Sequence, residues 1–180
     1  GGKSATSSGT ASGGGFTNQY SVSFDGSDDY ITTGSNFQST FNSGFSFSMW
    51  GKLSSTGSNR GLIGAENSNY LDRFVCFVDT SNRVGFYYTA NNQGVPTIRD
   101  ATGTNLTNWF HVVGTVEQDG SNVDLTLYVN GSQKATRSAT STMVNFGTTT
   151  TPADLFLAGR NYGGSLQLPF NGLLDEAALI

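Results

Sequence analysis

Cysteine is nearly absent from this sequence. Cys76 is the single one, so no disulfide can form within the chain. It lies in the apolar run RFVCFVD, where a small buried side chain is expected rather than a reactive thiol. Histidine is equally scarce, because His111 is the only one. The sequence therefore has no cysteine–histidine cluster for zinc or iron.

Charge is also in short supply, with 12% charged residues and a formal net charge of −4. The 9 basic residues are scattered, whereas phosphate contacts to nucleic acid need clustered lysine and arginine. Nucleic acid is therefore not an expected partner. No apolar run is long enough to cross a bilayer, so membrane insertion is not expected either.

The strong helix formers Ala, Leu, Glu and Lys are scarce, and Gly, Ser, Thr and Asn crowd the sequence. That balance favours strands joined by turns. Residues 1–15 read GGKSATSSGTASGGG, which is the composition of a flexible linker. The remainder has the length of one domain. We therefore predict a linker or tail over residues 1–15 and one domain over residues 16–180.

Apolar and polar residues alternate after Tyr20, which is the period of half-buried strands. The clearest alternation runs through FSFSMWGKL, residues 45–53, and another covers DLTLYV, residues 124–129. Further strands are predicted over Ser21–Phe24, Gly61–Gly64, Phe74–Val78, Arg83–Tyr88, Trp109–Glu117, Gln133–Arg137, Leu155–Gly159 and Gly172–Ile180. This many short strands, with no helical stripe, predict an all-β sandwich or barrel.

Turn residues separate the predicted strands. Asn130-Gly131 predicts a two-residue hairpin turn, because both residue types tolerate positive φ. Phe47, Leu127 and Leu157 lie on the apolar side of their alternating strands. We therefore expect these three side chains in the core between two sheets.

Four segments, in order, resemble the laminin G-like group of the concanavalin A-like lectin/glucanase superfamily. They are SVSFDGSDDYI, FSFSMWGKL, NWFHVVGTVEQDGSNVDLTLYVNGSQKA, and LFLAGRN followed by FNGLLDEAAL. The FDGSDDY motif with its polar loops also resembles lectin-like domains of marine bacteriophage structural proteins. The resemblance implies a two-sheet antiparallel jelly-roll sandwich. The alternation of apolar and polar residues independently predicts two packed sheets, because each sheet has one apolar face to bury.

The resemblance also implies calcium, because many relatives carry one such ion. Calcium prefers carboxylate, amide and backbone oxygens. The first and last strands of a jelly roll commonly lie together, which would bring Asp25 and Asp175 near each other. We therefore expect a structural Ca²⁺ with Asp25 and Asp175 as metal ligands. The alternative is that Asp25 only caps its own backbone in an Asx-turn.

Sugar binding needs aromatic faces beside polar groups that reach hydroxyls. Trp50 and Tyr87 lie opposite the apolar residues of their strands, and Tyr70 and Tyr162 lie in predicted loops that also contain arginine. We predict these four aromatic residues as ligand-binding. The alternative for each is a packing role, as when a loop covers an outward-facing tryptophan.

Catalysis is not expected. The superfamily's glucanases carry Glu, then Asp two residues on, then Glu three beyond, but here Glu117 and Asp119 are followed by Asn122. Glycosidases need two carboxyls flanking the scissile bond. Asp175 and Glu176 are adjacent, so on a regular strand they point to opposite faces. No G-x-S-x-G nucleophile motif occurs.

Together these patterns predict a non-catalytic carbohydrate- or surface-binding (adhesion) module of a larger extracellular or virion protein. The expected partner is a glycan or cell-surface polysaccharide, and the expected location is extracellular or on a virion surface. One alternative is a structural jelly roll that contacts neighbouring chains of an assembly. Another is a glycoside hydrolase or lyase.

Overall fold

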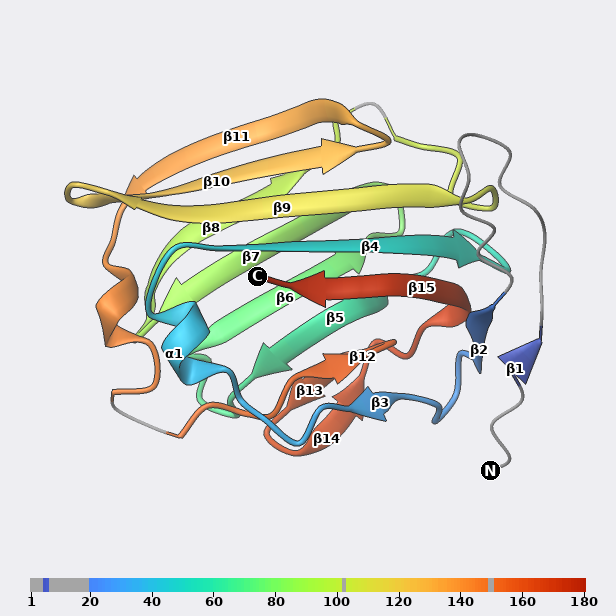
Figure 1. The fold of residues 1–180 in the computed structure, drawn as a ribbon, viewed down its shortest axis with the longest axis horizontal. Coiled ribbons are helices and arrows are strands. Elements are labelled where there is room, and N and C mark those ends of the chain that lie inside the picture. Colours follow the sequence, from blue (N-terminus) through green and yellow to red (C-terminus); the bar gives the residue numbers. More distant parts are fainter. Residues whose placement is uncertain (1–4, 7–19, 102, 149–150) are drawn as a thin grey trace.

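Two β-sheets packed face to face form the body of the protein in a computed structural model (Figure 1). The structure describes residues 5–6, 20–101, 103–148 and 151–180. Within them, the seven-stranded sheet has the order β1-β2-β15-β4-β9-β10-β11. Its strands are β1 (Ala5–Thr6), β2 (Ser21–Asp25), β15 (Asn171–Leu179), β4 (Phe45–Leu53), β9 (Phe110–Asp119), β10 (Asn122–Val129) and β11 (Ser132–Thr140).

The eight-stranded sheet has the order β14-β13-β5-β6-β7-β8, with β12 paired to both β3 and β5 at its side. Its strands are β14 (Ser165–Gln167), β13 (Arg160–Tyr162), β5 (Arg60–Glu66), β6 (Arg73–Val78), β7 (Val84–Ala90), β8 (Gln93–Arg99), β12 (Phe156–Leu157) and β3 (Ile31–Thr32). Pairing is antiparallel except between β13 and β5. The helices of the described residues are α1 (Gln38–Phe41) and η1 (Met143–Asn145). The all-β two-sheet sandwich is therefore confirmed.

The predicted hairpin turn is confirmed. Asn130 and Gly131 have φ angles of 52° and 75° and connect the paired residues Val129 and Ser132. Only residue types that tolerate positive φ at both positions make this turn without strain.

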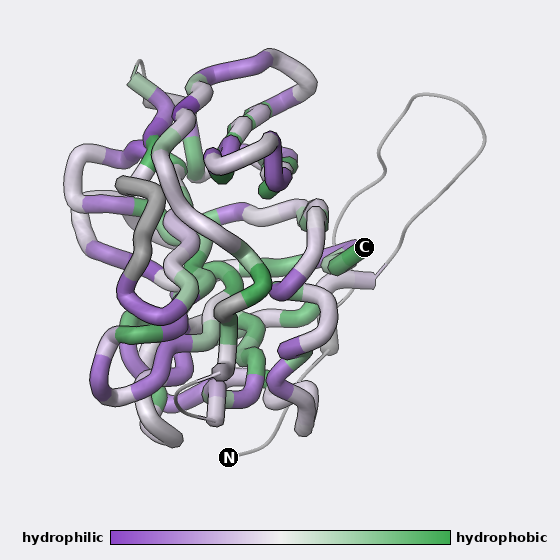
Figure 2. The backbone as a smooth tube through the Cα atoms, turned by 90° about the vertical axis from the view of Figure 1, so that its left-hand side faces the viewer, coloured by the Kyte–Doolittle hydropathy of each residue, from purple (hydrophilic) through white to green (hydrophobic). Residues whose placement is uncertain are grey.

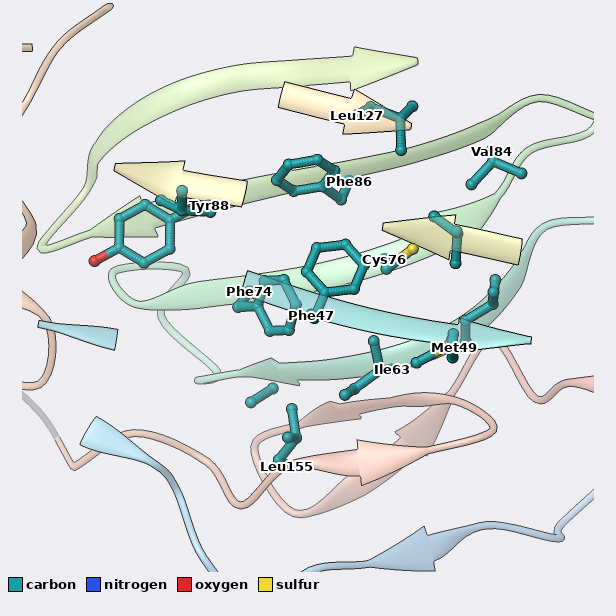
Figure 3. Packing of buried hydrophobic residues seen from close by; sticks show 14 of the residues in the cluster. Phe47, Met49, Ile63, Phe74, Cys76, Val84, Phe86, Tyr88, Leu127 and Leu155 are labelled. Carbon is teal, nitrogen blue, oxygen red and sulfur yellow. The ribbon is translucent and has the colours of Figure 1, made fainter. Parts of the chain in front are cut away.

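The core lies between the sheets, where both contribute alternate residues (Figure 3). From the seven-stranded sheet come Phe47 and Leu127, which are fully buried, as predicted. Leu157 is partly buried and packs against the same core. Cys76 is buried there as well, and burial raises the pKa of its thiol. That agrees with a packing role for this cysteine.

Hydrophobic and hydrophilic stretches are intermixed along the chain in the view turned by 90° (Figure 2). No helix among the described residues has the length and apolarity of a membrane span. Of the predicted linker over residues 1–15, the structure describes only Ala5–Thr6, which pair with β2. The rest of that linker, and residues 16–19 of the predicted domain, lie outside the described residues.

Candidate functional site

The outer face of the eight-stranded sheet gathers charged and aromatic side chains from four neighbouring strands. In register across the sheet, Tyr162 lies opposite Glu66, Glu66 opposite Arg73, and Arg73 opposite Thr89. The next residue of β6, Phe74, belongs to the core, so alternation turns Arg73 outward. We call six residues around this row the arginine–tyrosine cluster: Glu66, Tyr70, Arg73, Tyr87, Arg160 and Tyr162.

Glu66 lies at the centre of the cluster, with only 1% of its side chain exposed. Its Oε2 accepts hydrogen bonds from Arg160 Nη1 and from the Tyr87 hydroxyl, each at 2.9 Å. Arg73 Nη1 lies 3.8 Å from Glu66 Oε1. Within the described residues, Oε1 accepts no hydrogen bond. A buried carboxylate is thus held between two arginines, and its Oε1 is shielded from solvent on the side of Arg73.

The electrostatics of the cluster favour the charged form of Arg160 and the protonated form of Tyr87. Burial, and then repulsion by Glu66, raise the pKa of Tyr87 to about 12. Partial burial disfavours the charged form of Arg160, but interactions with Tyr87 and Glu66 outweigh it and raise the pKa of Arg160. Two guanidinium cations against one carboxylate leave one net positive charge at neutral pH.

Aromatic rings flank the two guanidinium groups. Arg73 lies 5.8 Å from the Tyr70 ring centroid and 5.2 Å from that of Tyr87, and Arg160 lies 5.4 Å from that of Tyr162. The rings of Tyr70 and Tyr162 are 5.2 Å apart, and Tyr70 is 49% exposed. These distances fall within the range of cation–π attraction. The cluster therefore presents planar aromatic and planar cationic groups to solvent together.

Side-chain hydrogen bonds fix the loop that carries Tyr70 between β5 and β6. Asn67 Oδ1 accepts from the Leu71 amide at 2.9 Å, and Asp72 Oδ1 accepts from the Asn91 amide at 2.9 Å. Asn67 and Asp72 are themselves buried. Buried polar side chains that replace backbone partners make a loop conformation specific. Tyr70, with φ at 63°, is thereby held over Arg73.

Gly64 lets β13 approach this face closely. A Cβ at Gly64 would lie 3.1 Å from both γ-carbons of Val75 and 3.4 Å from the Arg160 Cα. The tight contacts would be with Val75, whereas the Arg160 Cα lies at the edge of ordinary van der Waals distance, so the glycine leaves room for both neighbouring strands.

Three of the four predicted ligand-binding residues meet in the cluster: Tyr70, Tyr87 and Tyr162. Trp50 does not join them, because it lies on the outer face of the seven-stranded sheet. There it is opposite His111 in register, with the ring centroids 4.8 Å apart. Sequence reasoning missed Glu66. Its signal was a single carboxylate directly after the apolar run Gly61–Ala65.

The two predicted calcium ligands lie on adjacent strands but do not converge. Register places Asp25 opposite Asn171, four residues before Asp175, which is a separation of about 13 Å along β15. Asp25 Oδ1 accepts from the Ser27 amide at 2.7 Å, as in an Asx-turn. Among the described residues, no three His, Cys, Asp or Glu gather as a metal site. These two carboxylates do not fit a single ion, and calcium binding stays a prediction.

Comparison with known proteins places the chain in a family. Residues 25–180 match the family described as the concanavalin A-like lectin/glucanases superfamily, in its laminin G group. The chain belongs to this family. The resemblance drawn from the four sequence segments is thus confirmed at the level of the superfamily. Among curated proteins, none matches the chain.

Solved structures with the same fold come from several organisms. The CBM40 of the Ruminococcus gnavus IT-sialidase has a TM-score of 0.63 and 16% identity over 86% of this chain and 89% of that chain. Mouse laminin alpha1 domains LG4-5 have a TM-score of 0.63 and 15% identity, over 91% of this chain and 41% of that one. The leech intramolecular trans-sialidase has a TM-score of 0.67 and 16% identity, over 88% of this chain but only 25% of its own. At these identities the likeness shows the fold.

Proposed function

We propose that this domain is a non-catalytic glycan-binding module, and that its arginine–tyrosine cluster binds a sugar carrying a carboxylate. The observation that supports this most is the pair of guanidinium groups held over one buried carboxylate. Arginine matches carboxylate geometry with two parallel hydrogen bonds, which a single lysine does not provide. The net positive charge of the cluster favours an anionic group over a neutral one.

The remaining groups suit the rest of a sugar ring. Glu66 is buried beneath the two guanidinium groups, so its role in the site is to hold Arg160 and Arg73 in place for a ligand that they contact. Tyr70 is 49% exposed and offers an apolar face with a polar tip. Ligand sites typically combine aromatic surface with a few placed polar groups in this way. The cluster holds one carboxylate, whereas glycosidases use two, which supports a binding role over hydrolysis.

Related structures point to the same ligand class. The Ruminococcus gnavus CBM40 has been solved with alpha2,3 sialyllactose, and this form has a TM-score of 0.65 and 15% identity over 86% of the present chain. Sialyllactose ends in an acidic sugar with one carboxylate. The leech trans-sialidase contains a similar fold as a quarter of its length. We propose that the present domain likewise serves a larger extracellular or virion protein as an adhesion module.

Calorimetric titration with sialyllactose, and with lactose as the neutral control, tests the proposal. We expect binding of sialyllactose only. Arg73→Ala should weaken it at least about tenfold, since a hydrogen bond to a charged group contributes about 1.5–3 kcal/mol. The matched control is Arg137→Ala, which removes an exposed arginine from β11 of the other sheet and should leave affinity unchanged.

Two results would contradict the proposal. One is failure of the wild-type domain to bind acidic glycans across a broad array, with calcium supplied. The other is an Arg73→Ala variant that binds as well as the wild type. The structural alternative predicts self-association without glycan binding, which light scattering would detect.

A further inference from the structure

A second cluster of two arginines and one carboxylate lies at the other end of β6. Asp79 follows this strand, Arg83 precedes β7, and Arg99 ends β8. Asp79 Oδ2 lies 2.7 Å from Arg83 Nη2 and 3.5 Å from Arg99 Nε. The Arg99 guanidinium lies 5.4 Å from the ring centroid of Phe77. We call these four residues the Asp79 cluster.

The Asp79 cluster repeats the charge pattern of the arginine–tyrosine cluster. Partial burial acts to raise the pKa of Asp79, but hydrogen bonds from Arg83 and Ser81 outweigh it and lower that pKa. Two arginines and one ionised carboxylate again leave one net positive charge. The side chains of Arg83 and Arg99 are each 41% exposed, so both guanidinium groups can reach a ligand.

Both clusters lie on the same outer face. Phe74, Cys76 and Val78 of β6 belong to the core, so alternation turns Arg73, Val75 and Phe77 outward. Arg73 and Asp79 are six residues apart, a separation of about 20 Å along an extended chain.

Uncharged side chains connect the two clusters. Val75 lies opposite Tyr87, and the rings of Phe77 and Tyr87 are 5.9 Å apart. Next along β7, opposite Phe77 and Arg99, is Gly85. The face therefore has cationic groups at both ends and, between them, an apolar, aromatic strip that is largely buried, with Val75 0% and Phe77 7% exposed.

This concentration of positive charge is unusual for the chain. Four of its 9 basic residues, Arg73, Arg83, Arg99 and Arg160, belong to these two clusters, although the formal net charge is −4. A cationic surface attracts anionic ligands, even on a protein whose net charge is negative.

We propose that the two clusters form one extended site for a linear acidic oligosaccharide, with one anionic sugar on Arg73 and Arg160 and another on Arg83 and Arg99. This inference rests on the proposed glycan binding and adds the length and repeated charge of the ligand. Nucleic acid is a different polyanion, but phosphate contacts along its backbone need more clustered basic residues than the two arginine pairs of this face.

Ligands of different length separate the two ends of the site. We would titrate the domain with sialyllactose, which has one carboxylate, and with sialic acid oligomers, which have one carboxylate per sugar. Long oligomers should bind more tightly than sialyllactose, with a steeper dependence on salt. Arg99→Ala should weaken oligomer binding about five- to tenfold and leave sialyllactose unaffected. Arg73→Ala should weaken both, and Arg137→Ala neither.

The controls distinguish failure of this inference from failure of the proposed function. Arg99→Lys keeps the charge and should recover part of the oligomer affinity. If sialyllactose binds in an Arg73-dependent way but Arg99→Ala changes nothing, the extended site is overturned and the glycan site stands. If neither ligand binds, the proposed function fails as well. Tighter binding of single-stranded DNA than of acidic oligomers would also overturn the inference. Thermal unfolding of each variant checks that it is folded.

Discussion

The outer faces of the two sheets arise from the same alternation but carry different chemistry. Across four strands of the seven-stranded sheet runs a row of hydroxyl residues, Ser46, Thr115, Thr126 and Thr136. Across four strands of the eight-stranded sheet runs the row Tyr162, Glu66, Arg73 and Thr89. The first row is neutral, whereas the second contains a buried carboxylate with cationic neighbours.

This difference shows how a functional face can be built on a sheet. Hydroxyl groups at these partly exposed positions can bond with water or with each other, so their neighbours matter little. Glu66 is buried, and a buried charge is tolerated only with paired, hydrogen-bonded partners. Changes to the eight-stranded face should therefore affect stability more than matched changes to the other face.

Removal of the buried carboxylate should give the largest effect. Glu66→Ala leaves Arg160 and Tyr87 without their shared acceptor and should lower the free energy of unfolding by about 2–3 kcal/mol. Thr115→Ala, in the hydroxyl row of the other face, should cost less than about 1 kcal/mol. Urea unfolding of both variants measures the change in the free energy of unfolding. Equal decreases in the two variants would contradict the contrast between the two faces.

Alkaline pH should reveal the raised pKa of Tyr87. Its folded-state pKa is about 12, above the ordinary value of 10, so the unfolded chain loses this proton first. The resulting stability is fully present below pH 10 and is lost as the pH rises towards 12. The expected loss is on the order of 1–2 kcal/mol, discounted for the partial exposure of Tyr87. The stability difference between wild type and Tyr87→Phe should shrink over this range, and a constant difference would contradict the assignment.

Trp50 tests whether the seven-stranded face takes part in binding. Trp50→Ala removes a ring that is 37% exposed and contacts His111, so we expect a loss of about 1 kcal/mol. Affinity for sialyllactose should not change. If this variant instead abolished glycan binding, the binding face would have to be reassigned to the seven-stranded sheet.

The smallest effect concerns the single histidine. Burial lowers the pKa of His111 below its ordinary value, and attraction by Glu176 partly opposes this. The associated stability is present above pH 6.5 and is lost as the pH falls through the lowered pKa. NMR titration should show a further decrease of the His111 pKa in the Glu176→Gln variant. In the Trp50→Ala variant, the His111 pKa should increase. Shifts in the opposite directions would mean that the environment of His111 is wrongly described.

Most of the strands follow from local sequence. Strand β4, over Phe45–Leu53, was predicted with its observed bounds, because nine alternating residues give a clear period. Strand β8, over Gln93–Arg99, was not predicted. It contains Gly94 and Pro96, which weaken a strand pattern and are tolerated because β8 lies at the edge of its sheet. Strands β13 and β14 have only three residues each, too few for a period to emerge.

The sequence by itself determined which side of each strand faces the core, and hence that Tyr87 and Trp50 point outward. Tertiary structure alone decided that Tyr87 joins Glu66 and Arg160, whereas Trp50 lies on the opposite sheet. It also set Asp25 opposite Asn171 instead of Asp175. The reason is that alternation is a local property of each strand, whereas register depends on pairing between strands distant in sequence.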